Sequence, residues 1–149
     1  KAVKIEAISP SQAVIKAELG RWATKVFTLD KYLTPKYIRE AHVMTKGLAT
    51  NQFTEFRVAH KVYERIGKEV PVHRSVEITS VDTSSQPGMA FVFLTTKEAT
   101  MAEPNGAVTR WRLTVQYELI QPKTEAEILA NALGLYVTTM NVSEESAVK

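Results

Sequence analysis

The sequence has 149 residues, which is enough for one domain with a single hydrophobic core. Hydrophobic residues make up 44% and charged residues 23%, a composition that excludes a disordered chain. The net charge is only +3, and 19 Lys and Arg are interleaved with 16 Asp and Glu, so no concentrated basic face for nucleic acid is indicated. The absence of cysteine excludes disulfides, a thiol nucleophile and thiolate metal sites.

The first expected element is an extended arm over residues 1–8, where apolar and charged residues alternate. Ser9 and Pro10 are typical of a helix cap and a first helical position. The helix that follows carries one apolar stripe at spacings of four and three residues, formed by Ile15, Leu19, Trp22, Val26 and Leu29. This stripe is predicted to face the core.

Two further helices are predicted before the strands begin. One begins at Thr34, before Pro35, and ends near Gly47. Its inward residues are expected to be Tyr37, Ile38, Ala41 and Met44. The other is expected over residues 50–67. Its inward residues are expected to be Phe53, Phe56, His60 and Tyr63.

Beyond Pro71 the apolar period changes to two, which predicts strands. The first strand is expected to turn one face inward, formed by Val70, Val72, Val76 and Ile78. Residues 89–94 are apolar on both faces, which is typical of a central strand. After a tight turn at 103–106, a third strand alternates with an apolar face formed by Trp111, Leu113, Val115, Tyr117 and Leu119.

The C-terminal part is expected to add one helix and one strand. A short helix over residues 124–132 is capped by Thr124, and a last strand covers residues 135–142. Residues 143–149 are expected to be a frayed polar tail. The order of elements predicts an α+β domain in which helices pack on one face of a strongly curved antiparallel sheet.

Three histidines are the starting point for any catalytic or metal-binding hypothesis. His42, His60 and His73 fall on two helices and a strand, without the spacing of a metal-binding pair. No glycine-rich phosphate loop, nucleophile elbow or metalloprotease motif occurs. We therefore predict no catalytic residue, no metal site and no cofactor.

One alternative stays open, a small enzyme or ligand-binding protein, because a curved sheet wrapped by helices forms a cone that can hold a ligand or an acid–base pair. Its candidates are the titratable residues in or beside strands, His73, Glu77, Asp82 and Glu118. Strand alternation places both glutamates on polar faces, which favours solvated surface carboxylates. The alternative is excluded if the cone is filled by the side chains of Phe91, Phe93 and Trp111.

A third hypothesis, a DNA-binding module, rests on Arg110 and Arg112, which flank Trp111. The two arginines share one face of their strand, whereas Trp111 points to the other. Base stacking and phosphate contact are then not combined on one face, so this feature favours binding only weakly.

The most informative segment is residues 131–138, Asn-Ala-Leu-Gly-Leu-Tyr-Val-Thr. Gly134 permits a tight passage from helix to strand, and Asn131 can cap exposed backbone groups there. The segment resembles the Asn-Pro-Leu-Gly signature near the end of the TrbF and VirB-eight family, inner-membrane subunits of type IV secretion and conjugation systems. Ala132 stands where that family usually has proline, which indicates a divergent branch.

Two more stretches support the resemblance. Residues 21–30 are similar to the family's first periplasmic helix, and the strand that begins at Trp111 is similar to its tryptophan strand. Trp22 and Trp111 both lie on apolar stripes and are assigned to the core. The likeness covers nearly the whole chain.

The resemblance implies a single NTF2-like periplasmic domain over residues 1–149, preceded by a short cytoplasmic tail and one transmembrane helix in the bacterial inner membrane. It implies a non-enzymatic scaffold that connects this membrane to other subunits of a type IV secretion system that transfers plasmids by conjugation. Self-association as a dimer or higher oligomer and transient contact with transferred DNA are also implied.

Carried over residue by residue, the signature makes Asn131, Leu133 and Gly134 the candidate loop for assembly contacts, and Tyr136 begins the strand that positions it. Gly134→Arg is expected to leave the isolated domain folded and to abolish transfer by the parent system. Self-association is expected on the outer face of the first helix.

Overall fold

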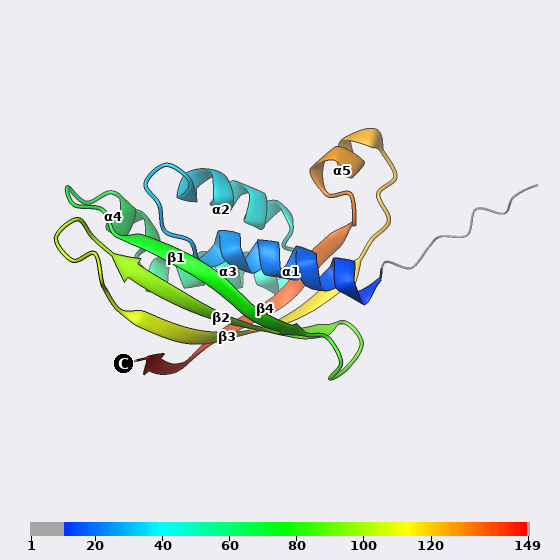
Figure 1. Ribbon diagram of the computed structural model, residues 1–149. Coiled ribbons are helices and arrows are strands. Elements are labelled where there is room, and N and C mark those ends of the chain that lie inside the picture. The colour runs from blue at the N-terminus through cyan, green and yellow to red at the C-terminus, as the bar shows by residue number, and fades with distance from the viewer. Residues whose placement is uncertain (1–10, 149) are drawn as a thin grey trace, which may run out of the picture.

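The computed structural model describes residues 11–148, and the side chains of residues 11–145. The chain forms four helices, three strands, a short helix and a last strand (Figure 1). The elements are α1 Gln12–Phe27, α2 Thr34–Val43, α3 Leu48–Ala59, α4 Val62–Ile66, β1 His73–Asp82, β2 Met89–Ala99, β3 Val108–Leu119, α5 Glu125–Ala130 and β4 Leu135–Val148.

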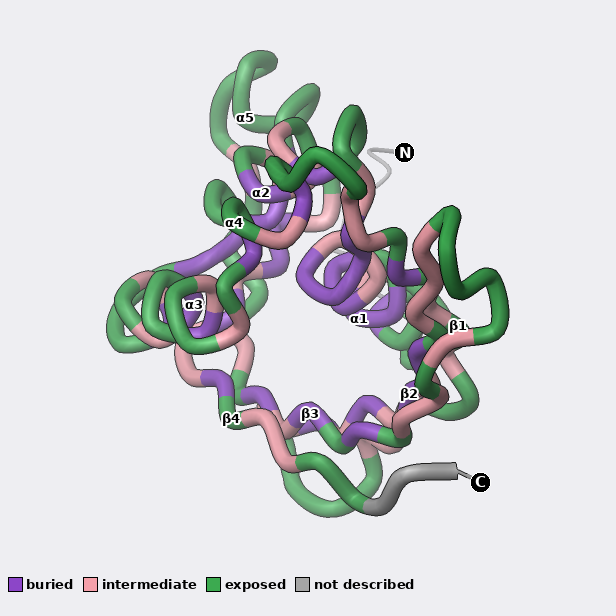
Figure 2. Tube along the Cα trace, turned by 90° about the vertical axis from the view of Figure 1, so that its left-hand side faces the viewer, coloured by how far each residue is buried: buried purple, intermediate pink, exposed green. Residues whose placement is uncertain are grey.

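The strands form one antiparallel sheet in the order β1-β2-β3-β4, so each strand pairs with its neighbour in the sequence. The sheet curves around α1, and α3 lies over its β4 side (Figure 2). Thr79 of β1 and Thr138 of β4 are extra residues at shifts in the strand register, and bulges of this kind increase the local twist. The predicted α+β class, with helices on one face of a curved antiparallel sheet, is confirmed.

The apolar stripe predicted for the first helix is buried, and Leu29 continues it past the helix end. The Trp22 indole N–H donates to the Ala41 carbonyl at 3.0 Å and so joins α1 to α2. Ser11 caps α1, because its hydroxyl accepts the N–H of Val14 at 3.3 Å. The predicted cap Ser9, the helix start at Pro10 and the arm over residues 1–8 lie outside the described residues.

The prediction of a single helix over residues 50–67 is wrong, because this segment forms two helices. The break is at Lys61, whose φ of 51° and ψ of 45° are left-handed. Phe53 and Phe56 face the core as predicted, but the break turns Tyr63 outward, where it is 56% exposed. Val62 and Ile66 form the buried face of α4 instead.

The predicted frayed tail over residues 143–149 is also wrong, because β4 continues to Val148. Its second half pairs with the first half of β3, down to a Val148–Val108 pair. The polar side chains of this segment give no apolar pattern from which a strand could be predicted. The strand forms because its backbone groups hydrogen-bond to β3, and this pairing does not require apolar side chains. Lys149 lies outside the described residues.

The interior of the cone is filled by side chains. The largest fully buried ones on the helices are Trp22, Phe27 and Phe53, and Trp111 of β3 is 8% exposed. The rings of Phe27 and Trp111 lie 5.5 Å apart between their centroids. Phe91 and Phe93 do not contribute, because the alternation of β2 buries Ala90, Val92 and Leu94 and turns the two phenylalanines to the outer face.

Candidate assembly site

The predicted loop joins α5 to β4 in a tight turn. Asn131 is buried, and its side chain accepts the N–H of Gly134 at 3.2 Å and donates to the Leu135 carbonyl at 2.7 Å. The Gly134 carbonyl accepts the N–H of Ile120 at 2.7 Å, which ties the turn to the end of β3. Asn131 and Gly134 therefore shape the loop from inside.

Gly134 has a φ of +70°, and a Cβ built on it would lie 1.8 Å from the Ile120 carbonyl oxygen. No side chain can be accommodated there without moving the backbone. This geometry replaces the expectation that Gly134→Arg leaves the domain folded, and the arginine is now expected to distort the turn itself.

Leu133 and Tyr136 are half-buried, so both keep part of their surface open to a partner. Tyr136 lies between the buried Leu135 and Val137 on β4 and points to the opposite face of the strand. The Lys46 ammonium lies 4.3 Å from the centroid of the Tyr136 ring, within cation–π range. Asn131 and Gly134 thus build the loop, whereas Leu133 and Tyr136 are partly exposed, and Leu133 also packs against the hydrophobic core.

The helix that leads into this loop adds apolar surface that the sequence did not assign to the site. None of the residues of α5, all of which the structure describes, is buried, and Leu129 is 81% exposed. Between α5 and the first two helices is a groove of about 380 Å³ lined by Lys25, Arg39, Glu40, Val43, Met44, Leu129 and Ala130. The signal was present in the sequence, because Ile128 and Leu129 are adjacent and cannot both face a core.

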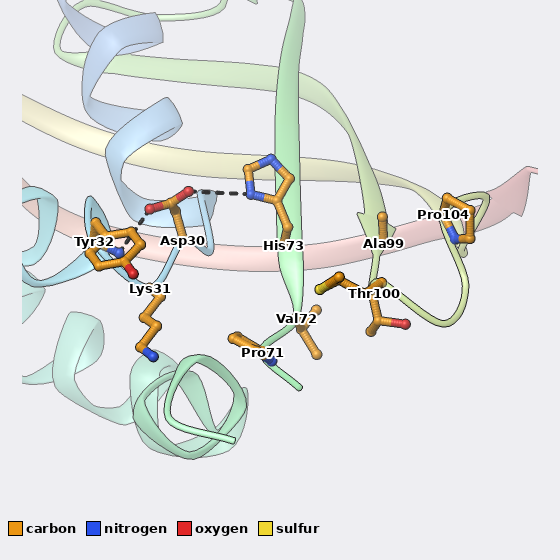
Figure 3. A pocket seen from close by; sticks show the side chains of 10 residues that line it. Asp30, Lys31, Tyr32, Pro71, Val72, His73, Ala99, Thr100 and Pro104 are labelled. Carbon is orange, nitrogen blue, oxygen red and sulfur yellow. Dashed lines mark hydrogen bonds and ion pairs between the residues drawn. The ribbon is translucent and has the colours of Figure 1, made fainter. Parts of the chain in front are cut away.

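A second hollow, of about 460 Å³, lies at the opposite end of the molecule (Figure 3). The turn after α1, the start of β1 and the β2–β3 loop form its walls. Asp30 accepts the N–H groups of Tyr32 and Leu33 at 2.8 and 2.9 Å, and the His73 imidazole lies 3.4 Å from its carboxylate. The two backbone donors are the main cause that lowers the pKa of Asp30, and His73 adds to it.

Arg74 is buried beside this hollow, with 1% of its surface exposed. Its Nε donates to the Phe27 carbonyl at 2.6 Å, and Nη1 lies 3.7 Å from Glu98, which also pairs with Arg65. Burial lowers the pKa of Arg74 to about 10. The arginine ties the end of α1 to β1, β2 and α4. The sequence carried a signal for it, since it occupies an inward position between Val72 and Val76.

The catalytic candidates are not brought together. Glu77 and Glu118 are exposed, and His42 lies on the open side of α2. His60 packs against Phe56, with ring centroids 4.1 Å apart, and burial is the main cause that lowers its pKa. Across residues 11–148, no group of three or more His, Cys, Asp or Glu is placed to hold a metal ion.

Comparison with known proteins assigns the chain to one protein family. The sequence profile of the VirB8 protein family matches residues 1–145. A search of curated proteins found no match.

Within the described part of the chain, no helix has the length and apolar character needed to cross a bilayer.

Solved structures of the same fold include VirB8 of Agrobacterium tumefaciens, with 17% identity, 97% of this chain and 99% of that chain covered, and a TM-score of 0.79. The TrwG component of Bartonella birtlesii has 17% identity, 95% and 97% coverage, and a TM-score of 0.78. TraE has 20% identity, 93% and 100% coverage, and a TM-score of 0.76. These similarities confirm the predicted NTF2-like fold.

Proposed function

Since this chain belongs to the VirB8 family, we propose that it is the periplasmic domain of a single-pass inner-membrane subunit whose turn at residues 131–136 contacts other subunits. Membership makes it an assembly subunit of a type IV secretion system. The match over residues 1–145 is the observation that carries this conclusion, because it spans the whole domain. TrwG and TraE among the structural relatives support a conjugative system as the parent machine.

We propose that the contact surface combines Leu133 and Tyr136 with Leu129 of α5. All three retain exposed apolar or aromatic surface, and Leu129 is 81% exposed. Aromatic and aliphatic side chains of this kind are typical anchors at protein interfaces. Asn131 and Gly134 support the surface by fixing the turn and do not contact the partner themselves.

Self-association as a dimer or higher oligomer is proposed through the outer face of α1. That face carries Lys16, Arg21 and Lys25, of which Arg21 pairs with Glu18 and Lys25 with Glu40 of α2 at 3.6 Å. Transient contact with transferred DNA is proposed on the outer face of the sheet, where Arg112 stands opposite Phe93 in the register of β2 and β3. The mixed charge of the chain favours weak, salt-dependent contact.

We propose that the domain acts without catalysis. The conical interior holds the aromatic rings of Trp22, Phe27, Phe53 and Trp111, which leaves the alternative of an internal active site without support. Arg74, a buried cation of this interior, donates Nε to the Phe27 carbonyl and lies beside Glu98, while its Nη2 has no hydrogen-bond partner among the described residues.

The proposed contact surface is tested by complementing a strain that lacks the gene and measuring transfer frequency. Leu133→Glu together with Tyr136→Glu places charge on the surface and is expected to lower transfer at least a hundredfold. Met101→Glu is the matched control, since Met101 is 94% exposed in the β2–β3 loop, at the far end of the molecule from residues 131–136 (Figure 1), and full transfer is expected. Normal transfer by the double variant, at wild-type protein levels, would remove the role given to the loop.

A further inference from the structure

The two edges of the sheet are β1 and β4, and an open edge exposes backbone N–H and C=O groups that can pair with another chain. The edge of β1 is bonded at its start and flanked by α1 further along. Leu29 and Arg74 exchange two backbone hydrogen bonds of 2.9 and 3.1 Å. Beyond them α1 lies so close to β1 that a Cβ on Gly20 would be 3.7 Å from the Ile78 side chain.

The first half of the β4 edge is occupied by the chain itself. Val137 donates to the Met44 carbonyl at 2.7 Å and accepts the Lys46 N–H at 2.9 Å, so residues 44–46 lie along the edge as a short parallel strand. The Met140 N–H is bound by the Gln52 side chain at 2.7 Å. This half of β4 therefore already shows how an extended segment docks there.

The second half of the β4 edge has no such cover. In an antiparallel ladder the N–H and C=O of one residue face the same neighbour, and the direction alternates along the strand. Because Met140 faces outward, Val142 and Glu144, opposite Leu113 and Trp111, also face outward. Among residues 11–148, no backbone or side-chain group hydrogen-bonds to the outward groups of Val142 or Glu144.

A groove of about 410 Å³ adjoins this open edge, between α3 and β4. It is lined by Gln52, Glu55, Phe56, Ala59, His60, Met140, Asn141 and Val142. Phe56, Met140 and Val142 give it an apolar floor, and Glu55 and the neighbouring Glu144 add negative charge. The lining contains neither Lys nor Arg.

We propose that residues 141–145 accept an extended segment of a partner protein as a fifth strand. The segment carries an apolar residue opposite Val142, where it enters the groove, and a Lys or Arg two positions away, opposite Glu144. Backbone pairing supplies the affinity, and these two alternate side chains supply the selection. The inference rests on the proposed function only in taking the partner to be another secretion subunit.

A second copy of this chain fits the edge less well. The β4 residues that share this face are Met140, Val142 and Glu144, and none of them is basic. In each symmetric β4–β4 register within residues 140–144, Glu144 would therefore face Met140, Val142 or the Glu144 of the other copy. The charge of the groove favours a different, basic partner.

The probe is the eight-residue peptide Thr-Val-Thr-Lys-Thr-Val-Thr-Lys, titrated into the ¹⁵N-labelled domain and followed by NMR. We expect changes in the chemical shifts of the Val142 and Glu144 amides and slower hydrogen exchange at both. A peptide with Glu in place of Lys is expected to bind at least tenfold more weakly, and N-methylation of alternate peptide amides is expected to abolish binding. The proposal would be overturned by equal affinity for all three peptides or by chemical-shift changes confined to other residues. Self-association of the domain through β4 would also overturn it.

Two variants locate the site. Val142→Pro removes the outward N–H, and proline is tolerated on a sheet edge, so this variant is expected to stay folded and lose peptide binding. Glu144→Lys keeps every backbone group and is expected to reverse the preference, binding the Glu peptide at least fivefold more tightly than the Lys peptide. An unchanged preference in Glu144→Lys contradicts the proposal even if Val142→Pro does not fold. Because the assay does not measure transfer, its outcome is independent of the role proposed for the 131–136 loop.

Discussion

Gly134 and Gly20 occupy opposite environments. Gly134 has a φ of +70° and no space for a Cβ, whereas a Cβ on Gly20, inside α1, would make an ordinary contact at 3.7 Å. The same Gly→Ala substitution should therefore have opposite effects on stability at the two positions.

Gly134→Ala is expected to lower the free energy of unfolding by about 3 kcal/mol or more, because it combines backbone strain with a clash. Gly20→Ala is expected to raise it by about 0.5–1 kcal/mol, the helix propensity of alanine over glycine. Urea denaturation of both variants measures the difference. Similar small effects at the two sites would contradict the geometry of the turn.

Asp30 stabilises the turn after α1 as a carboxylate that accepts two backbone N–H groups. Its pKa is lowered in the folded state, so its contribution to stability is complete above the unfolded pKa and is lost as the pH falls through the folded pKa. Asp30→Ala should cost about 1 kcal/mol at pH 7 and progressively less below about pH 4.

Asp30→Asn is the matched control, since its amide oxygen can still accept these N–H groups while the charge is lost. A smaller loss is expected, and urea denaturation between pH 7 and pH 3 gives both values. A deficit for Asp30→Ala that does not change with pH would show that the charge of Asp30 is not involved.

Arg74 marks the limit of sequence-based prediction at the residue scale. The alternation of β1 placed Arg74 on the inward face. The neighbouring sequence does not show that its guanidinium would bond to the Phe27 carbonyl, 47 positions away, and lie beside Glu98. For the 131–136 loop the sequence identified the right turn, and only the structure separates the buried Asn131 and Gly134 from the half-exposed Leu133 and Tyr136.

At the scale of elements, the break between α3 and α4 is the main departure from the predicted helices. The apolar residues on both sides of it keep near-helical spacing, so the sequence favoured one helix. Lys61, in the left-handed region, ends the first helix without a glycine. The new direction allows Val62 and Ile66 to reach the core.

Lys61→Gly is expected to raise the free energy of unfolding by about 0.5–1 kcal/mol, because glycine adopts this conformation without Cβ strain. Lys61→Ala removes the lysine side chain and keeps the strain, so no gain is expected. Thermal and urea denaturation of the two variants distinguish these effects. A loss of stability in Lys61→Gly would mean that the left-handed conformation is not costly here.

The predicted strands were correct where apolar residues recur, on both faces of β2 and on one face of β3, and wrong at the end of β4, where no apolar pattern exists. Pairing of β4 with the first half of β3 extends the sheet by backbone bonds alone. The same extension produces the uncovered edge at Val142 and Glu144, which no inspection of the sequence could have located.

At the scale of the whole molecule, the core and the surface follow different rules. The core was predictable because apolar residues recur at the helix and strand periods. The exposed features, namely the apolar side of α5, the groove beside α3 and the open edge of β4, arise from packing between distant segments. Surface features of this kind therefore have to be located in the structure.

The central claim is that this domain acts through its surface as an assembly subunit, and in-cell photo-crosslinking tests it most directly. p-Benzoylphenylalanine replaces Tyr136 in the full-length protein, and Met101 serves as the control position because it is 94% exposed in the β2–β3 loop, at the far end of the molecule (Figure 1). Crosslinks from position 136, but not from position 101, to another subunit of the secretion machine are the predicted result. Absence of a subunit crosslink from position 136 in cells that still transfer cargo would contradict the account.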